Sequence, residues 1–319
     1  MSEWGPHRPV RTAFDVDVGD LLPFDSPATM RGFVMTPADL AQDTPTRFVY
    51  AMVGGGTSVA TLDLHVAGEA GYSFAEYLAS HGFTVCAMDH PGCGASSEVA
   101  DIYLLDAGTI VRCHARALAL ARERVGGADV VTIGIGHSMG GMLTVMLQDR
   151  ERCFDAIVVL SYGDRGLPEV LTADELSMSE VPAESCSARI IELARLRFGP
   201  NSTVEAKAPA HGMFLADDTP LPVRAALADH LTALTYTSGL TAMVPGAVTP
   251  EMARIREPVF VGMGEHDLIP EPHRAVASYP SSPDVRLYVL PGAGHLVNQA
   301  ANRHELWRRI SDFGLDVGQ

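Results

Sequence analysis

Ser138 lies at the centre of Gly136-His137-Ser138-Met139-Gly140, where glycine stands two residues before and two residues after the serine. An apolar, β-branched run at 130–135 (VVTIGI) precedes this segment, and a helical pattern at 139–148 follows it. A serine at a tight strand-to-helix turn needs small neighbours, because the turn strains the backbone and crowds its flanks. The pattern predicts that Ser138 is held out at the end of a strand as a nucleophile.

A serine hydroxyl is a poor nucleophile at neutral pH, so it needs a base within hydrogen-bond reach and an acid that orients the base. Asp267 follows an apolar run at 258–263 (PVFVGM), and His295 follows another at 285–290 (VRLYVL). Loops gather at the carboxyl edge of a parallel sheet, so side chains that follow different strands can meet there. The spacing predicts a catalytic triad of Ser138, His295 and Asp267.

Two alternatives to these partners are open. The chain has twelve histidines, and His266, which stands next to Asp267, is the main rival for the base. Asp164 follows an apolar run at 156–162 and is the rival for the acid.

Attack on a carbonyl also creates a negative oxygen, which backbone N–H groups must stabilise. Met139, directly after the serine, is expected to supply one donor. The second is expected from Gly54-Gly55-Gly56, with Gly55 favoured, because glycine allows close approach of a substrate. These glycines could also serve only to form a sharp turn.

The rest of the chain alternates apolar strand patterns with amphipathic helix patterns after a Pro-containing leader. Strands are expected at 47–53, 83–88, 130–135, 156–162, 258–263 and 285–290, and helices at 72–80, 105–125, 139–148 and 298–313. This alternation predicts an α/β fold with a mostly parallel central sheet and helices on both faces. Residues 163–256 show helical patterns at 188–197 and 223–234 but no clear buried strand, and they are too long for a simple loop. They are expected to form an inserted helical cap.

Four segments together resemble the α/β-hydrolase superfamily, specifically its branch with a lid: VVTIGIGHSMGG, FTVCAMDHPGCGAS, GMGEHD and LPGAGH. The resemblance covers about 47–313, with the cap matching only in position. It implies an α/β-hydrolase core in two parts, 1–162 and 257–319, separated by the cap at 163–256. Serine at position 138 disfavours the members that use an aspartate nucleophile.

The sequence departs from the family pattern at the glycine loop. The family commonly has His-Gly after its third strand, whereas this chain has Val53-Gly54. The position of the second oxyanion donor is therefore defined only to within one residue. The stretch from Asp89 to Ser96 resembles a turn with a structural role in the family. Neither Asp89 nor Cys93 is given a catalytic part.

Composition limits the partners and the compartment. With 23 basic and 39 acidic residues the formal charge is −16, which would repel nucleic acid and anionic membrane surfaces. The five cysteines form no CxxC pair, and the N-terminal residues lack the pattern of a signal peptide. We expect a cytoplasmic protein that binds neither nucleic acid nor a membrane. The sequence does not decide whether the protein forms a homodimer.

The expected substrate is a small, apolar acyl compound, because the cap is rich in methionine and aromatic residues. The candidate contacts are Gly54, Gly56, His137, Met213, Phe214, Tyr236 and Met243. The cap residues among them could instead form the packing core of the cap.

The predicted function is hydrolysis of a carboxylic ester, lactone or thioester through an acyl-enzyme. A serine triad needs no cofactor, and no metal-ligand spacing stands out. The alternatives are an acyltransferase or C–C bond hydrolase that uses the same triad, and a non-catalytic ligand-binding member of the fold.

Overall fold

The computed structural model describes residues 4–39, 47–126, 130–180, 183–199, 214–269 and 271–318. Within these residues, one eight-stranded sheet has the order β1-β2-β4-β3-β5-β6-β7-β8. The strands are β1 (Pro9–Asp17), β2 (Thr29–Pro37), β3 (Arg47–Met52), β4 (Phe83–Met88), β5 (Val131–His137), β6 (Ala156–Leu160), β7 (Val259–Gly264) and β8 (Val285–Leu290). Strand β2 is antiparallel to β1 and β4, and the other neighbours are parallel. The expected α/β fold with a mostly parallel sheet is confirmed.

The central strands are mostly apolar because both faces of the sheet are covered. Every residue of β4, β6 and β7 is buried. In β3, Phe48 and Tyr50 belong to one core cluster, whereas Val49 and Ala51 belong to the other. This alternation follows from the two-residue period of a strand.

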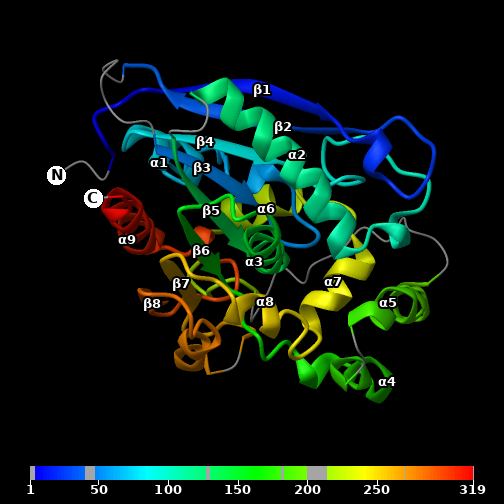
Figure 1. Cartoon of the computed structure of the whole chain (residues 1–319). Coiled ribbons are helices and arrows are strands. Elements are labelled where there is room, and N and C mark those ends of the chain that lie inside the picture. The colour runs from blue at the N-terminus through cyan, green and yellow to red at the C-terminus, as the bar shows by residue number, and fades with distance from the viewer. Residues whose placement is uncertain are drawn as a thin grey trace.

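Helices cover the two faces in pairs. The helices are α1 (Phe74–Ser80), α2 (Ala107–Val125), α3 (Met139–Glu151), α4 (Ala173–Leu176), α5 (Ala183–Phe198), α6 (Leu221–Ala228), α7 (Tyr236–Met243), α8 (Thr249–Ala253) and α9 (Arg303–Asp316). Side chains of α2 and α3 join one core cluster, and side chains of α1 and α9 join the other. Figure 1 shows α2 and α3 crossing the near face of the sheet, while α1 and α9 lie at its other side. None of the described helices is long and apolar enough to span a bilayer.

The first two strands were not among the predicted elements. Strand β1 forms one edge of the sheet, and only Phe14 and Val16 are buried along it. An edge strand with one solvated face carries alternating polar residues rather than an apolar run. The leader therefore contains an antiparallel hairpin that extends the parallel sheet.

The segment between β6 and β7 is helical, as expected. It contains α4 to α8, and among its described residues it contributes no strand to the sheet. Side chains of α5, α7 and α8 share the core cluster of α2 and α3, whereas α6 packs against residues near Leu64 and Tyr72. The division of the chain at residues 162 and 256 stays a prediction.

One predicted helix in this segment is shorter than expected. The pattern at 223–234 predicted a helix, but α6 ends at Ala228. Residues 230–234 instead run along the glycine loop: Ser58 N–H donates to the His230 carbonyl at 3.2 Å, and Thr232 N–H donates to the Gly56 carbonyl at 3.0 Å. We call residues 230–234 the strap.

Candidate active site

Ser138 occupies a strained turn between β5 and α3. Its φ is 53° and its ψ is −123°, which a non-glycine residue rarely adopts. A Cβ on Gly136 would lie only 2.1 Å from the Gly140 carbonyl oxygen, so the turn can close only with glycine there. The Ser138 N–H donates to the Leu160 carbonyl at 2.8 Å, which ties the turn to β6. This hydrogen bond to β6 thus helps to keep Ser138 in its strained conformation.

The structure brings Ser138, His295 and Asp267 together in series. His295 Nε2 lies 2.9 Å from Ser138 Oγ, and His295 Nδ1 lies 2.7 Å from Asp267 Oδ1. The carboxylate can only accept, so Nδ1 carries the hydrogen and Nε2 of the neutral ring is free to accept from the serine. This arrangement suits a base that takes a proton from Ser138.

Burial differs along this series. The Asp267 side chain is 1% exposed and that of His295 is 6% exposed, whereas Ser138 is half-buried. Burial pushes the pKa of Asp267 up, but the charge that His295 carries when its ring is protonated and the hydrogen bond from His295 outweigh burial, so the pKa lies below its usual value. The acid is therefore ionised at neutral pH, where it can stabilise a protonated His295.

Two residues that the sequence did not assign to this task hold the backbone of His295. The carbonyl oxygen of His295 accepts from the Ser161 hydroxyl at 2.9 Å and from His137 Nε2 at 2.9 Å. Burial, followed by the nearby His295, lowers the pKa of His137 to about 4, so its ring is neutral. Ser161 lies just after β6 with a positive φ of 51°. The place of Ser161 at a strand end was its only signal in the sequence.

The glycine loop lies against the strained turn. A Cβ on Gly54 would approach Ser138 Cβ to 3.3 Å, and a Cβ on Gly55 would approach the Met139 side chain to 3.5 Å. Met139 is the first residue of α3, and helix geometry leaves such an N–H without an acceptor inside the helix. Gly54 thus lies beside Ser138 and Gly55 beside Met139. The assignment of Met139 and Gly55 as donors stays a prediction.

Gly56 faces the strap rather than the serine. Its φ is 76°, and its carbonyl accepts from the strap. Leu234, at the end of the strap, lies over the loop: its Cδ1 would be 2.5 Å from a Cβ on Gly55. Leu234 was not among the candidate contacts, because its approach to Gly55 depends on tertiary folding.

The two rival residues have other surroundings. His266 is exposed, and its backbone N–H donates to the Ala293 carbonyl at 2.9 Å. Asp164 is half-buried, and its carbonyl accepts from Gly246 N–H at 2.7 Å. The carboxylate that contacts His295 is that of Asp267.

Asp89 organises a turn, in line with the structural role expected for it. Its carboxylate accepts from Val59 N–H at 2.7 Å and from Ala95 N–H at 2.8 Å. The Cys93 thiol donates to the Ala233 carbonyl at 3.1 Å, so this turn also touches the strap.

The candidate substrate contacts from the cap fall into different environments. Phe214 is half-buried and meets the His295 ring edge to face, with 5.7 Å between centroids. Tyr236 is buried and stacks on Tyr103 at 4.9 Å, which fits the packing alternative for this residue. Met243 is half-buried in α7. Met213 lies outside the described residues.

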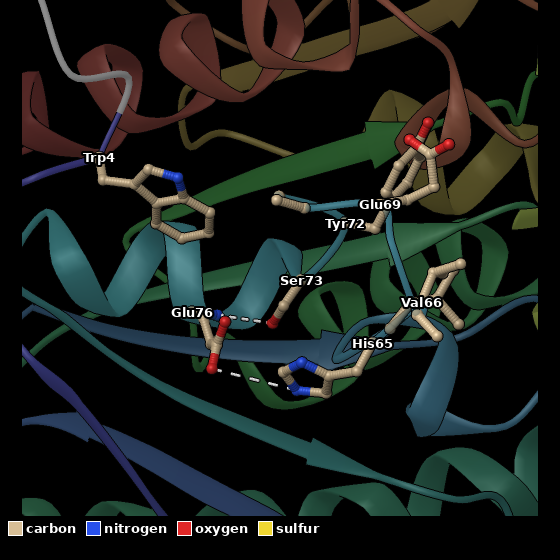
Figure 2. A pocket seen from close by; sticks show the side chains of 11 residues that line it. Trp4, His65, Val66, Glu69, Tyr72, Ser73 and Glu76 are labelled. Atoms are coloured by element: carbon tan, nitrogen blue, oxygen red, sulfur yellow. Dashed lines mark hydrogen bonds and ion pairs between the residues drawn. The ribbon is translucent and has the colours of Figure 1, made fainter. Parts of the chain in front are cut away.

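A separate cavity of about 510 Å³ lies on the α1 side, and it is not lined by Ser138, His295 or Asp267. Figure 2 shows His65 and Glu76 pointing toward each other there. Together with Asp63 they could offer three metal ligands within 4.8 Å. However, the Asp63 carboxylate already accepts from the Ser73 hydroxyl at 2.7 Å and pairs with Arg11 at 3.0 Å. We interpret the group as a surface hydrogen-bond network.

Solved structures with the same fold include several hydrolases. An esterase from Thermogutta terrifontis aligns at 18% identity over 96% of this chain and 100% of its own, with a TM-score of 0.64. An enol-lactonase from Burkholderia xenovorans aligns at 18% identity over 90% of this chain and 96% of its own, with a TM-score of 0.60. A monoacylglycerol lipase from Paleococcus ferrophilus aligns at 17% identity over 86% of this chain and 97% of its own, with a TM-score of 0.61. At these identities the likeness shows the fold alone.

A comparison with curated proteins gives no significant match. The sequence model of the Alpha/beta hydrolase family, by contrast, matches residues 54–308. This range contains the glycine loop, the strained serine turn, the helical segment, and the strands that precede Asp267 and His295. The chain therefore belongs to the alpha/beta hydrolase family.

Proposed function

We propose that the protein is a serine hydrolase that cleaves a carboxylic ester, lactone or thioester through an acyl-enzyme. The observation that carries the proposal is the unbroken series of hydrogen bonds from Asp267 through His295 to a half-buried Ser138. Membership of the hydrolase family supports the same reaction class.

In the proposed reaction, Ser138 Oγ attacks the substrate carbonyl while His295 Nε2 takes the hydroxyl proton. The C–O or C–S bond to the leaving group then breaks, and His295 returns the proton to that group. Water attacks the resulting ester of Ser138 with His295 again as the base, which releases the acid and restores the serine. Asp267 stabilises the protonated ring in both steps.

The negative oxygen that forms in each step would be met by backbone N–H groups at Met139 and at Gly54 or Gly55. Such donors act mainly on the transition state, where the charge develops. The apolar side chains of Phe214 and Leu234 near these groups favour an apolar substituent on the substrate. The names of the structural neighbours, which include esterases, a lipase and a lactonase, agree with this class.

The first test is labelling with a fluorophosphonate followed by intact mass measurement. Wild type and Ser177→Ala should each gain one label, whereas Ser138→Ala should gain none. Ser177 is a suitable control because it is exposed and its hydroxyl donates to the nearby Asp174 carbonyl at 2.7 Å. An unlabelled wild type would contradict the proposal.

The second test is a panel of p-nitrophenyl esters, lactones and thioesters of graded chain length. Turnover should fall by at least about a thousandfold in Ser138→Ala, because residual rates come only from binding and the oxyanion donors. Product analysis with an added alcohol distinguishes hydrolysis from acyl transfer. Equal turnover by wild type and Ser138→Ala would exclude Ser138 as the nucleophile.

A further inference from the structure

Three buried side chains form a continuous series of hydrogen bonds that ends at the glycine loop. Tyr50 lies in β3, His90 follows β4, and His114 lies in α2; each is at most 1% exposed. The Tyr50 hydroxyl lies 2.8 Å from His114 Nδ1, and His114 Nε2 lies 2.7 Å from His90 Nδ1. His90 Nε2 lies 3.0 Å from the Val53 carbonyl oxygen. The proposed catalytic steps use none of these three side chains, which we call the relay.

The direction of each hydrogen bond follows from the last acceptor. The Val53 carbonyl can only accept, so His90 Nε2 carries a hydrogen. Burial lowers the pKa of His90 to about 4 and lowers that of His114 as well, so both rings are neutral near pH 7. His90 Nδ1 must then accept from His114, and His114 Nδ1 must accept from Tyr50. All donors point toward Val53, and bonds arranged in this way polarise one another.

The acceptor of the relay is the peptide that opens the glycine loop. The Val53 carbonyl and the Gly54 N–H belong to one planar peptide unit, so holding one orients the other. A Cβ on Gly140 would lie 2.5 Å from the Val53 carbonyl oxygen, which places this peptide against the start of α3. The peptide is therefore held by His90 and confined by Gly140.

We propose that Tyr50, His114 and His90 are positioning residues that fix the Val53–Gly54 peptide and thereby the oxyanion-binding loop. The inference rests on the proposed function, because the loop affects a rate only if its N–H groups meet a negative oxygen. Donors that are already in place stabilise the transition state without reorganisation during the reaction. Loss of the relay should therefore lower kcat and leave KM nearly unchanged.

The direct test replaces His90. His90→Phe removes the donor to Val53 and should lower kcat by about tenfold or more, but by less than about a hundredfold. Deleting an oxyanion donor outright would lower kcat about a hundredfold or more. His90→Gln should recover most of the loss, because its terminal amide nitrogen can reach the position of Nε2 and donate to Val53. A purely structural role would not produce this difference in kcat at constant KM.

A milder pair of variants keeps the test valid if His90→Phe does not fold. Tyr50→Phe removes the first donor of the relay, and it should lower kcat in the same direction by a smaller factor. Tyr279→Phe is its matched control, because the Tyr279 hydroxyl is buried and has no hydrogen-bond partner among the described residues. Tyr279→Phe should leave kcat unchanged.

Hydrogen–deuterium exchange separates this inference from the proposed function. Exchange of the amides in residues 53–58 should be faster in His90→Phe than in wild type, and His90→Gln should resemble wild type. This readout needs no substrate, so it decides the positioning role even if wild type hydrolyses no ester. Unchanged exchange in this loop in both His90→Phe and Tyr50→Phe would overturn the inference, whatever their activity.

Discussion

Asp267 fixes both the orientation and the hydrogen position of His295. Its Oδ1 accepts from Nδ1 at 2.7 Å and leaves Nε2 free for Ser138. In Asp267→Asn the amide can donate to Nδ1, which favours the tautomer with hydrogen on Nε2, and that tautomer cannot accept the serine proton. We expect kcat/KM for an ester to fall about 10³- to 10⁴-fold.

Steady-state kinetics on the best ester of the panel would measure this effect. Asp164→Asn is the matched control, because it makes the same change at the rival acid, and it should retain the wild-type rate. A comparable loss in Asp164→Asn, together with a mild effect of Asp267→Asn, would transfer the role of the acid to Asp164.

The sequence predicted individual residues where their signal is local. Ser138, Asp267 and His295 each follow an apolar strand pattern, so the strand ends and the glycine-flanked motif around Ser138 together suggested that they meet. Ser161 also follows an apolar strand, but nothing else in the sequence marks it, because its contact with the His295 carbonyl depends on how β6 and the loop before Val297 lie together. Residues that support a site through the backbone of another residue are hard to predict from local patterns.

At the level of elements, the strained turn between β5 and α3 depends on a missing side chain. A Cβ on Gly136 would lie 2.1 Å from the Gly140 carbonyl oxygen and 2.4 Å from Thr144 Oγ1. Backbone cannot move away as a flexible side chain can. We expect Gly136→Ala to lower the free energy of unfolding by about 2 kcal/mol or more, and to reduce fluorophosphonate labelling of Ser138.

Urea unfolding and the rate of labelling would measure both effects. Gly108→Ala is the control, because its Cβ would meet only ordinary contacts, with Asp106 at 3.6 Å and Arg112 at 3.8 Å. Gly108 lies within α2, where alanine should be neutral or stabilise by up to about 1 kcal/mol. A Gly136→Ala variant as stable and reactive as Gly108→Ala would contradict the tight turn.

Elements with an apolar core pattern were predictable, and those at the margins were not. The predicted strands at 83–88 and 285–290 coincide with β4 and β8. The sequence does not predict the β1–β2 hairpin, because its edge strand is largely exposed. It predicts a helix over the strap, because Leu231 and Leu234 continue the helical spacing of α6. The strap leaves the helix because its backbone bonds the glycine loop, a tertiary contact that overrides local pattern.

For the whole molecule, the inserted helices and the sheet form one connected body. Residues of α5, α7 and α8, such as Leu193, Leu240 and Met252, share a core cluster with α2 and α3. These helices are thus attached to the sheet by apolar contacts, and we expect them to unfold with the sheet in a single transition. The sequence predicted an insertion at this place. It did not predict the shared core, because that core depends on which helix faces pack against one another.

Three buried histidines should make the stability of this body depend on pH. Burial lowers the pKa of His90 and His137 to about 4 and lowers that of His114 as well. In the unfolded chain a histidine titrates near about 6.5, so below that pH the unfolded state binds more protons than the folded state. The contribution of these neutral histidines to the free energy of unfolding is therefore complete above about pH 6.5, and it is lost as the pH falls toward about 4.

Urea unfolding at about pH 7.5 and about pH 5.5 would measure this dependence, because the two values bracket the titration of an unfolded histidine. Each histidine that stays neutral in the folded state should account for a loss of about 1.4 kcal/mol over this interval. His90→Gln removes one such group, so its loss of stability between the two pH values should be smaller than that of wild type by about 1.4 kcal/mol. The comparison cancels the carboxylates, which both proteins share. An equal pH dependence in the two proteins would mean that His90 is already protonated in the folded state, and the direction assigned to the relay would then be wrong.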